Sequence, residues 1–170
     1  MRLVIPTAEW ERAHREYLNE WGSSRVIPSC FNLHDFVNYE SYLEEMMKRK
    51  DGYGNWLPFS SYFLVNHKDR ILGMIDIRHE LNDFLYRIGG NIGYSVRPSE
   101  RQKGYATLLL KMGLDKCREL GMDKVLITCD EDNIGSAKVI LNNGGREDKS
   151  EVDEDQTVKR RFWIDLSSKN

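Results

Sequence analysis

The sequence predicts an α/β (α+β) fold, in which a mixed, mostly antiparallel central sheet is flanked by helices. Three observations predict this fold. Apolar residues recur at helical spacing before residue 55, two apolar runs within 62–78 are joined by a short polar turn, and a strand–helix–strand unit follows at 91–129. A short polar turn favours an antiparallel hairpin, and a helix between two strands favours a crossover connection. The 170 residues, 40% of them hydrophobic, suffice for one domain with its own core.

Two helices are predicted in the first third of the chain. Residues 8–20 carry apolar side chains at helical spacing, and we expect that helix to end near Gly22. Residues 35–50 form the second predicted helix, and the glycine-containing segment 51–55 breaks it. One face of the second helix is expected to be buried, and its members are Phe36, Tyr39, Leu43, Met46 and Met47.

The rest of the chain alternates strands and helices. The expected strands are 62–65, 70–78, 91–96, 124–129 and 158–166, and the expected helices are 104–120 and 136–142. Pro98 ends the third strand, because proline has no N–H to continue a ladder. Gly121 suits the position just past the end of a helix. The acidic run from Glu147 to Asp155 is expected to form a solvated loop or hairpin.

Composition excludes several classes of protein. The net charge is −2, with 25 basic and 27 acidic residues intermixed, which argues against binding to nucleic acid through phosphate neutralisation. No apolar run is long enough for a membrane span, and the start of the chain does not resemble a signal peptide, so we expect a cytoplasmic protein. The three cysteines are far apart and form no CxxC pair, so neither a metal site nor a disulfide framework is predicted.

The most informative segment is the loop at 101–104, which connects a strand to a helix. Backbone N–H groups at a helix N-terminus have no partner within the helix, and the helix dipole adds positive potential, so the loop suits a pyrophosphate. Gly104 has no Cβ and allows close approach, while Arg101 and Lys103 add charge. Neither GxxxxGK[ST] nor GxGxxG is present. On its own, the loop is equally compatible with an ordinary turn.

Two longer segments resemble the acetyl-coenzyme A signature of the GNAT acyltransferase superfamily. The first is Val96-Arg97-Pro98-Ser99-Glu100-Arg101-Gln102-Lys103-Gly104-Tyr105-Ala106, which resembles V-x-P-x-x-R/Q-x-x-G-x-G/A. The second is Asp132-Asn133-Ile134-Gly135-Ser136-Ala137, followed by Asn143-Gly144-Gly145. The segment 77–82 is similar to that of a group of bacterial acetyltransferases. The resemblance implies one GNAT domain over 1–170, with a variable helical acceptor-side part at 1–58 and the cofactor-binding core at 60–166.

The resemblance also implies which residues bind acetyl-CoA. Backbone amides of the loop would hold the pyrophosphate, and the pantetheine arm would lie along the preceding strand like an added strand. One N–H near Tyr94 or Val96 would polarise the thioester carbonyl. Asn133 would bind the arm near Ser136, although Asn133 is equally suited to cap a helix. The implied cofactor-binding residues are Tyr94, Ser95, Val96, Arg101, Gln102, Lys103, Gly104, Tyr105, Ala106, Asn133 and Ser136.

The catalytic groups are less defined. The expected reaction is direct attack of a neutral amine on the thioester, which needs a base for the amine and a proton for the thiolate. Many members of the family carry a tyrosine seven residues after the asparagine, where this chain has Ile140. His79 and Glu80 are candidate bases, although His79 also suits a turn with a satisfied hydrogen bond. Asp76 lies on the same predicted strand.

Three functions compete at this point. The first is an acetyl-CoA-dependent N-acetyltransferase acting on a primary amine of a small molecule, amino acid or peptide. The second is a CoA-binding sensor of the same fold without turnover, which Ile140 favours. The third is a protein-interaction domain in which the loop is only a turn. Arg78 and Arg87 suit an acidic acceptor, and Asp76, Glu80 or Asp83 suit a cationic one. A homodimer is compatible with the resemblance.

Overall fold

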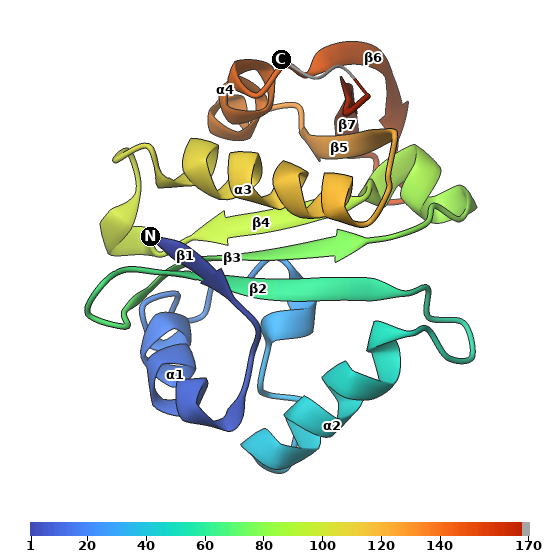
Figure 1. Cartoon of the computed structure of the whole chain (residues 1–170). Helices are drawn as coiled ribbons and strands as arrows, with labels where there is room; N and C mark the ends of the chain where they lie inside the picture. The colour runs from blue at the N-terminus through green and yellow to red at the C-terminus, as the bar shows by residue number, and fades with distance from the viewer. Residues whose placement is uncertain (168–170) are drawn as a thin grey trace.

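The computed structural model describes residues 1–167 and consists of seven strands and four α-helices within that range (Figure 1). The strands are β1 (Arg2–Val4), β2 (Phe59–Val65), β3 (Ile71–Arg78), β4 (Ile92–Val96), β5 (Lys124–Asp130), β6 (Arg146–Val152) and β7 (Val158–Asp165). The helices are α1 (Glu11–Asn19), α2 (Tyr39–Lys50), α3 (Tyr105–Glu119) and α4 (Ile134–Asn142). Short helical turns lie at Ala8–Trp10, Ser29–Phe31, Leu85–Gly89 and Pro98–Glu100.

The strands form two antiparallel sheets rather than one continuous sheet. The first has the order β1-β2-β3-β4 and the second has the order β5-β7-β6. The predicted hairpin is present, because β2 and β3 pair antiparallel across the turn at 66–70. The predicted fold class, a mixed α/β arrangement with mostly antiparallel strands and flanking helices, is therefore confirmed. Its division into two sheets was not predicted.

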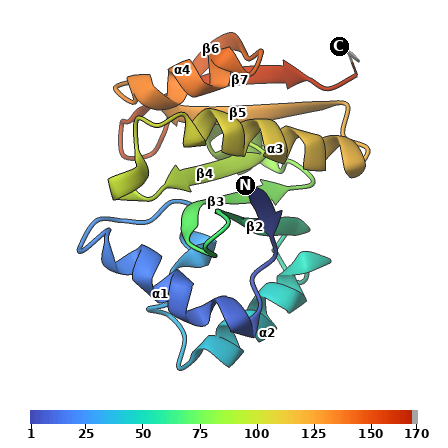
Figure 2. The ribbon, with the colours of Figure 1, turned by 60° about the vertical axis from the view of Figure 1, so that its left-hand side comes forward.

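The two faces of the first sheet are covered by different parts of the chain. Helices α1 and α2 lie on one face, and α3 lies on the other, toward β5 and α4 (Figures 1 and 2). Strand β3 is buried on both faces. Its Ile75 and Ile77 side chains belong to the core beneath α3, whereas Met74 packs with the residues of the N-terminal layer. Gly113 lets α3 approach β3 closely, since a Cβ there would lie 2.4 Å from Ile75 Cδ1.

The N-terminal layer is packed around aromatic rings. His14 is fully buried, and its ring contacts those of Tyr39, Tyr42 and Phe63 edge-on. Its Nε2 lies 2.8 Å from the backbone oxygen of Phe31, and its Nδ1 lies 3.3 Å from the Tyr39 hydroxyl. Because a neutral imidazole offers one donor and one acceptor, both contacts fit the uncharged ring. Burial lowers the pKa of His14 to about 4.

Several local predictions were wrong or incomplete. The second predicted helix begins at Tyr39 rather than at residue 35, and Asn38 caps it by accepting a bond from the Ser41 N–H. Met47, which we expected to be buried, is 75% exposed, whereas Tyr42, which was not assigned to the buried face, is fully buried. The 1–58 part is not purely helical, because β1 pairs with β2. The acidic run lies in the β6–β7 hairpin, whose charged outer strand β6 is exposed, as is common for edge strands.

Candidate acetyl-donor site

The facing edges of β4 and β5 diverge from one junction, and the region between these edges is called the cleft below. Each is an edge strand of its own sheet, and they are joined at one end by Asn91. The Asn91 N–H donates to Leu126 O at 2.6 Å, and Asn91 Oδ1 accepts from the Leu126 N–H at 2.8 Å. Beyond this point β4 pairs only with β3. Because Arg97 donates to Leu72 on β3, strand alternation turns the backbone groups of Tyr94 and Val96 toward the open edge.

The loop after β4 presents a row of free backbone donors. Gln102 and Gly104 both adopt the left-handed conformation, with φ of 61° and 80°. In the described part of the chain, no acceptor meets the N–H groups of residues 102–106. A Cβ built on Gly104 would meet nothing within 4 Å, so the space in front of the loop is open. Five unpaired amides thus lie at the start of α3, and such an arrangement is suited to an anion.

The two basic side chains of the loop are already engaged. The Arg101 guanidinium lies 4.9 Å from the centre of the Trp21 ring, so it is stacked on the end of the α1 layer. Lys103 Nζ lies 2.9 Å from Glu100 Oε2 and donates to Ser99 O. Tyr105 packs partly against the core beneath α3. Of the groups in this loop, the backbone amides are therefore the ones left without a partner.

An ion-pair network fixes the base of the loop to α1. Arg97 is buried, its Nε donates to Ile71 O, and its Nη1 lies 2.5 Å from Glu20 Oε1. The other Glu20 oxygen accepts from the hydroxyl and the N–H of Ser99. Partial burial disfavours the charge on Glu20, but the hydrogen bonds from Ser99 and Arg97 outweigh burial and lower its pKa. The sequence analysis missed this network, because nothing local pairs residues 77 positions apart.

The predicted residues of β4 and α4 meet across the cleft. The Tyr94 hydroxyl lies 2.7 Å from Ser136 Oγ, which bridges β4 to the first turn of α4. Asn133 Oδ1 accepts from the Ser136 N–H at 3.0 Å, so Asn133 caps α4 in the way that its alternative role requires. Ser95 faces the opposite side, where its hydroxyl lies 2.9 Å from the Tyr17 hydroxyl. The structure thus brings Tyr94, Asn133 and Ser136 together and directs Ser95 to the N-terminal layer.

Ile140 stands where many members of the family that the sequence resembles have a tyrosine, and its side chain does not reach the cleft. Ile140 is fully buried in the core beneath α3. Gly145 packs closely on it, since a Cβ there would lie 2.6 Å from Ile140 Cγ2. Asn143 Nδ2 donates to Thr107 O, which ties the end of α4 to the start of α3. Ile140 and Asn143, which belong to the second half of the sequence signature, therefore pack against α3, the helix that follows the loop.

His79 and Glu80 lie at the closed end of the sheet. The Arg78 N–H donates to Asn91 O, so the residues just after Arg78 lie beyond the junction of β4 and β5. His79 Nε2 lies 2.8 Å from Ser60 Oγ, and burial lowers the pKa of His79. These are the contacts of a turn residue with a satisfied hydrogen bond. Glu80 is exposed, and the structure does not bring it to the cleft.

The carboxylate of Asp76, on β3, is buried on the face of the sheet that packs against the N-terminal layer. Asp76 Oδ2 lies 3.0 Å from Arg78 Nη2, and its Oδ1 accepts from the Gly93 N–H of β4. Burial raises the pKa of Asp76, although Arg78 and the Gly93 N–H oppose this shift. Arg78 also donates to Gly89 O and Gly90 O. The pair therefore braces the turn that leads into β4.

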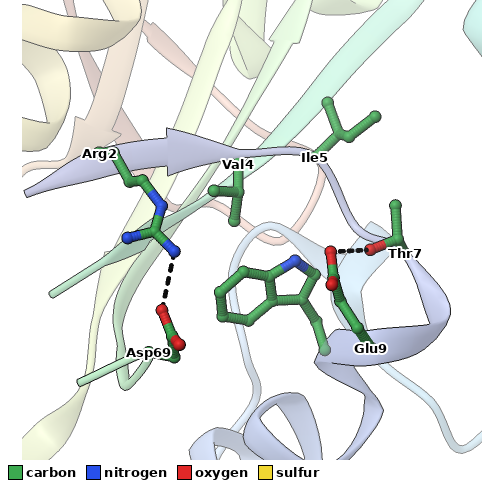
Figure 3. Close-up of a pocket in the computed structure, with 7 residues that line it drawn as sticks. Arg2, Val4, Ile5, Thr7, Glu9 and Asp69 are labelled. Carbon is green, nitrogen blue, oxygen red and sulfur yellow. Dashed lines mark hydrogen bonds and ion pairs between the residues drawn. The ribbon is translucent and has the colours of Figure 1, made fainter. Parts of the chain in front are cut away.

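An open hollow of about 590 Å³ lies at the outer edge of the first sheet, away from the cleft. Its lining includes Trp10, and Figure 3 shows Arg2 and Val4 of β1 and Thr7 and Glu9 of the following turn around it. The Arg2–Asp69 ion pair spans one side, and Thr7 donates to Glu9 at the other. Strands β2 and β3 separate β1 from β4. The hollow is consequently a feature of the sheet edge and not of the cleft.

Two searches over the described residues gave negative results. No group of three or more His, Cys, Asp or Glu side chains within 1–167 is arranged to hold a metal ion. In the same range, none of the helices combines the length and the apolar character that crossing a membrane requires.

The fold is shared with acetyltransferases of known structure. Spermidine N-acetyltransferase from Vibrio cholerae, crystallised with CoA and spermine, superposes with a TM-score of 0.67 at 16% identity, covering 98% of this chain and 95% of that one. RimJ from Mycobacterium smegmatis, in complex with CoA-disulfide, gives a TM-score of 0.66 at 20% identity, covering 96% and 80%. At these identities the likeness shows the fold. A comparison with curated proteins gave no match.

The sequence itself matches a family model. The model describes an acetyltransferase (GNAT) domain, and the match runs from residue 2 to residue 146. It therefore includes the N-terminal layer, β4, the loop at 101–106 and α4. Because the match covers most of the chain, this protein belongs to the GNAT family of acetyltransferases.

Proposed function

We propose that this acetyltransferase uses acetyl-CoA as its donor and transfers the acetyl group to a primary amine of a small molecule, amino acid or peptide by direct attack. The observation that carries the proposal is the row of five unpaired amides at 102–106 beside the open edge of β4. Amides at a helix N-terminus favour a pyrophosphate. An open strand edge accepts an extended arm through backbone hydrogen bonds. CoA contains both groups.

The structural relatives agree with this assignment. The Vibrio cholerae enzyme was crystallised with CoA and an amine, and RimJ was crystallised with a CoA derivative. In this chain we assign the pyrophosphate to the amides of 102–106 and the arm to the backbone of Tyr94 and Val96. Asn133 contributes by holding the first turn of α4 beside the arm.

Ligand-induced stabilisation tests the proposed donor. A ligand present at about 100 times its dissociation constant stabilises a protein by about 2.7 kcal/mol. We expect acetyl-CoA and CoA to raise the melting temperature, and ADP, which has the pyrophosphate but not the arm, to raise it less. If millimolar acetyl-CoA leaves the melting temperature unchanged, the donor assignment is wrong.

A second candidate is a CoA-binding module without turnover, which the burial of Ile140 favours. The two candidates differ in thiol release. We expect free CoA to appear when acetyl-CoA is mixed with a panel of primary amines, and the acetylated amine to appear in equal amount by mass spectrometry. Binding without release by any amine in the panel supports the non-catalytic module.

A further inference from the structure

Tyr94 and Ser136 place a hydroxyl pair in the cleft between the two sheets. The Tyr94 side chain is largely buried and reaches from β4 to the first turn of α4, where its oxygen lies 2.7 Å from Ser136 Oγ. Cys129, on β5, is a third side chain with a transferable hydrogen, and it is buried.

Aminolysis of a thioester requires a proton at the sulfur. The amine nitrogen attacks the carbonyl carbon, a C–N bond forms, and the C–S bond breaks with its electron pair moving to sulfur. The nitrogen loses one proton to solvent and the sulfur gains one, so amine and acetyl-CoA become amide and CoA thiol. A hydrogen-bond donor at the sulfur accelerates this step by stabilising the departing thiolate.

The geometry of the cleft directs the sulfur to Tyr94. An arm that starts at the amides of 102–106 and follows the free edge of β4 runs from Val96 toward the junction at Asn91. Tyr94 lies between those points, and its hydroxyl is on the α4 side of the edge. Ile140 offers no hydrogen and is sealed in the core. Cys129 is buried, with 7% of its surface exposed, and it packs in the core beneath α3.

We propose that Tyr94, oriented by Ser136, is the catalytic residue that donates its hydroxyl proton to the departing CoA sulfur. This inference rests on the proposed function and assigns one of its catalytic groups. Burial raises the pKa of Tyr94 to about 12, so the phenol retains its proton at neutral pH. After transfer, the phenolate regains a proton from solvent and no net charge accumulates.

The decisive experiment measures the pKa of the CoA thiol in the binary complex, and it needs no acceptor. The thiolate absorbs in the ultraviolet, so bound CoA is titrated in the wild type, in Tyr94→Phe and in the control Tyr62→Phe. Tyr62 is a partly buried tyrosine of β2 that packs on the same core. A hydrogen bond to the thiolate is expected to raise the acid dissociation constant of bound CoA about tenfold in the wild type and the control relative to Tyr94→Phe.

The outcomes separate this inference from the proposed function. If CoA binds and Tyr94→Phe leaves the thiol pKa unchanged, Tyr94 does not contact the sulfur, and the donor assignment stands without it. If the wild type does not bind CoA, both the role of Tyr94 and the proposed acetyl donor are wrong. Where an amine supports turnover, kcat of Tyr94→Phe should be about 100-fold lower, with KM for acetyl-CoA within threefold. A kcat within threefold of the wild-type value overturns the catalytic role.

Discussion

Asn91 and Leu126 join the two sheets through two hydrogen bonds, one from each residue's backbone N–H. The Asn91 N–H donates to Leu126 O, and the Leu126 N–H donates to the Asn91 side chain. Asn91 Nδ2 also donates to Arg78 O on β3. A single asparagine thus continues hydrogen bonding from the first sheet to the second and then lets β4 and β5 separate. Among the described residues, no backbone hydrogen bond links 92–96 to 124–130, so the two edges diverge from this junction.

Asn91→Ala should therefore weaken both stability and binding of the acetyl donor. Removing the side chain leaves the buried N–H of Leu126 without its acceptor, and we expect a loss of about 2–3 kcal/mol in the free energy of unfolding. The affinity for acetyl-CoA should fall with it, measured by calorimetry. Asn66→Ala is the control, because the Asn66 side chain also makes two hydrogen bonds to backbone groups but lies in the exposed β2–β3 turn. Equal loss of acetyl-CoA affinity in both variants would contradict the role of Asn91.

Gly104→Ala should reduce acetyl-CoA affinity at least tenfold. The left-handed backbone at Gly104 disfavours a side chain by about 1–2 kcal/mol, and the added methyl would enter the open space before the amides. Gly121→Ala is a matched control at the other end of α3, since Gly121 has φ of 76° and an equally open Cβ position. Both variants should lose similar stability by thermal melting, while only Gly104→Ala loses affinity. Normal binding by Gly104→Ala would remove the loop from the donor site.

Glu20→Gln should loosen the 101–106 loop from a distance. The neutral amide leaves the buried Arg97 guanidinium without a counter-charge, which we expect to cost about 2 kcal/mol in unfolding free energy. Ser99 also loses a charged acceptor, so the acetyl-CoA dissociation constant should rise several-fold. Glu16→Gln on the same helix, which removes only an exposed ion pair with Arg12, should change neither quantity. Identical behaviour of the two variants would show that the network is not coupled to the loop.

We expect the free energy of unfolding to decrease in mild acid because His14 is buried in its neutral form. Its pKa is lowered from 6.5 to about 4 by burial, so the unfolded chain binds a proton before the folded chain does. The stabilisation is complete above pH 6.5 and is lost progressively as the pH falls toward 4. We expect a loss of about 2 kcal/mol between pH 6.5 and pH 5, measured by urea denaturation.

A variant without this imidazole tests the assignment. His14→Gln should be less stable at pH 7 and should show a flatter pH dependence between 6.5 and 5. His67→Gln, at an exposed turn position, should keep the wild-type profile. If His14→Gln keeps the wild-type slope, another group is responsible for the acid sensitivity.

The sequence predicted most elements where the pattern is strong and local. The hairpin at 62–78 and the helix at 104–120 have clear periodicity, and the loop between β4 and α3 has its proline and glycine at fixed spacing. Strand β1 was missed because three residues are too few for a periodic signal. Strand β6 was assigned to an acidic loop or hairpin, because all but one of its residues are exposed and none gives an apolar alternation.

The features that were missed depend on contacts between distant residues. The helical phase of α2 allowed two buried faces, and packing against the His14 cluster selected the one with Tyr42 rather than Met47. Nothing around Asn91 in the sequence signals that its side chain reaches β5. The bridge between Tyr94 and Ser136 also spans 42 residues. The motifs therefore indicated candidate residues, but they did not indicate which distant residues those candidates contact.

Strand β3 separates the N-terminal layer from the core beneath α3. Met74 and Asp76 face the layer built by residues 1–58, while Ile75 and Ile77 face the side of α3. Because neighbouring positions of this strand pack in different layers, a substitution at Met74 acts first on the N-terminal layer and one at Ile75 acts first on the core beneath α3.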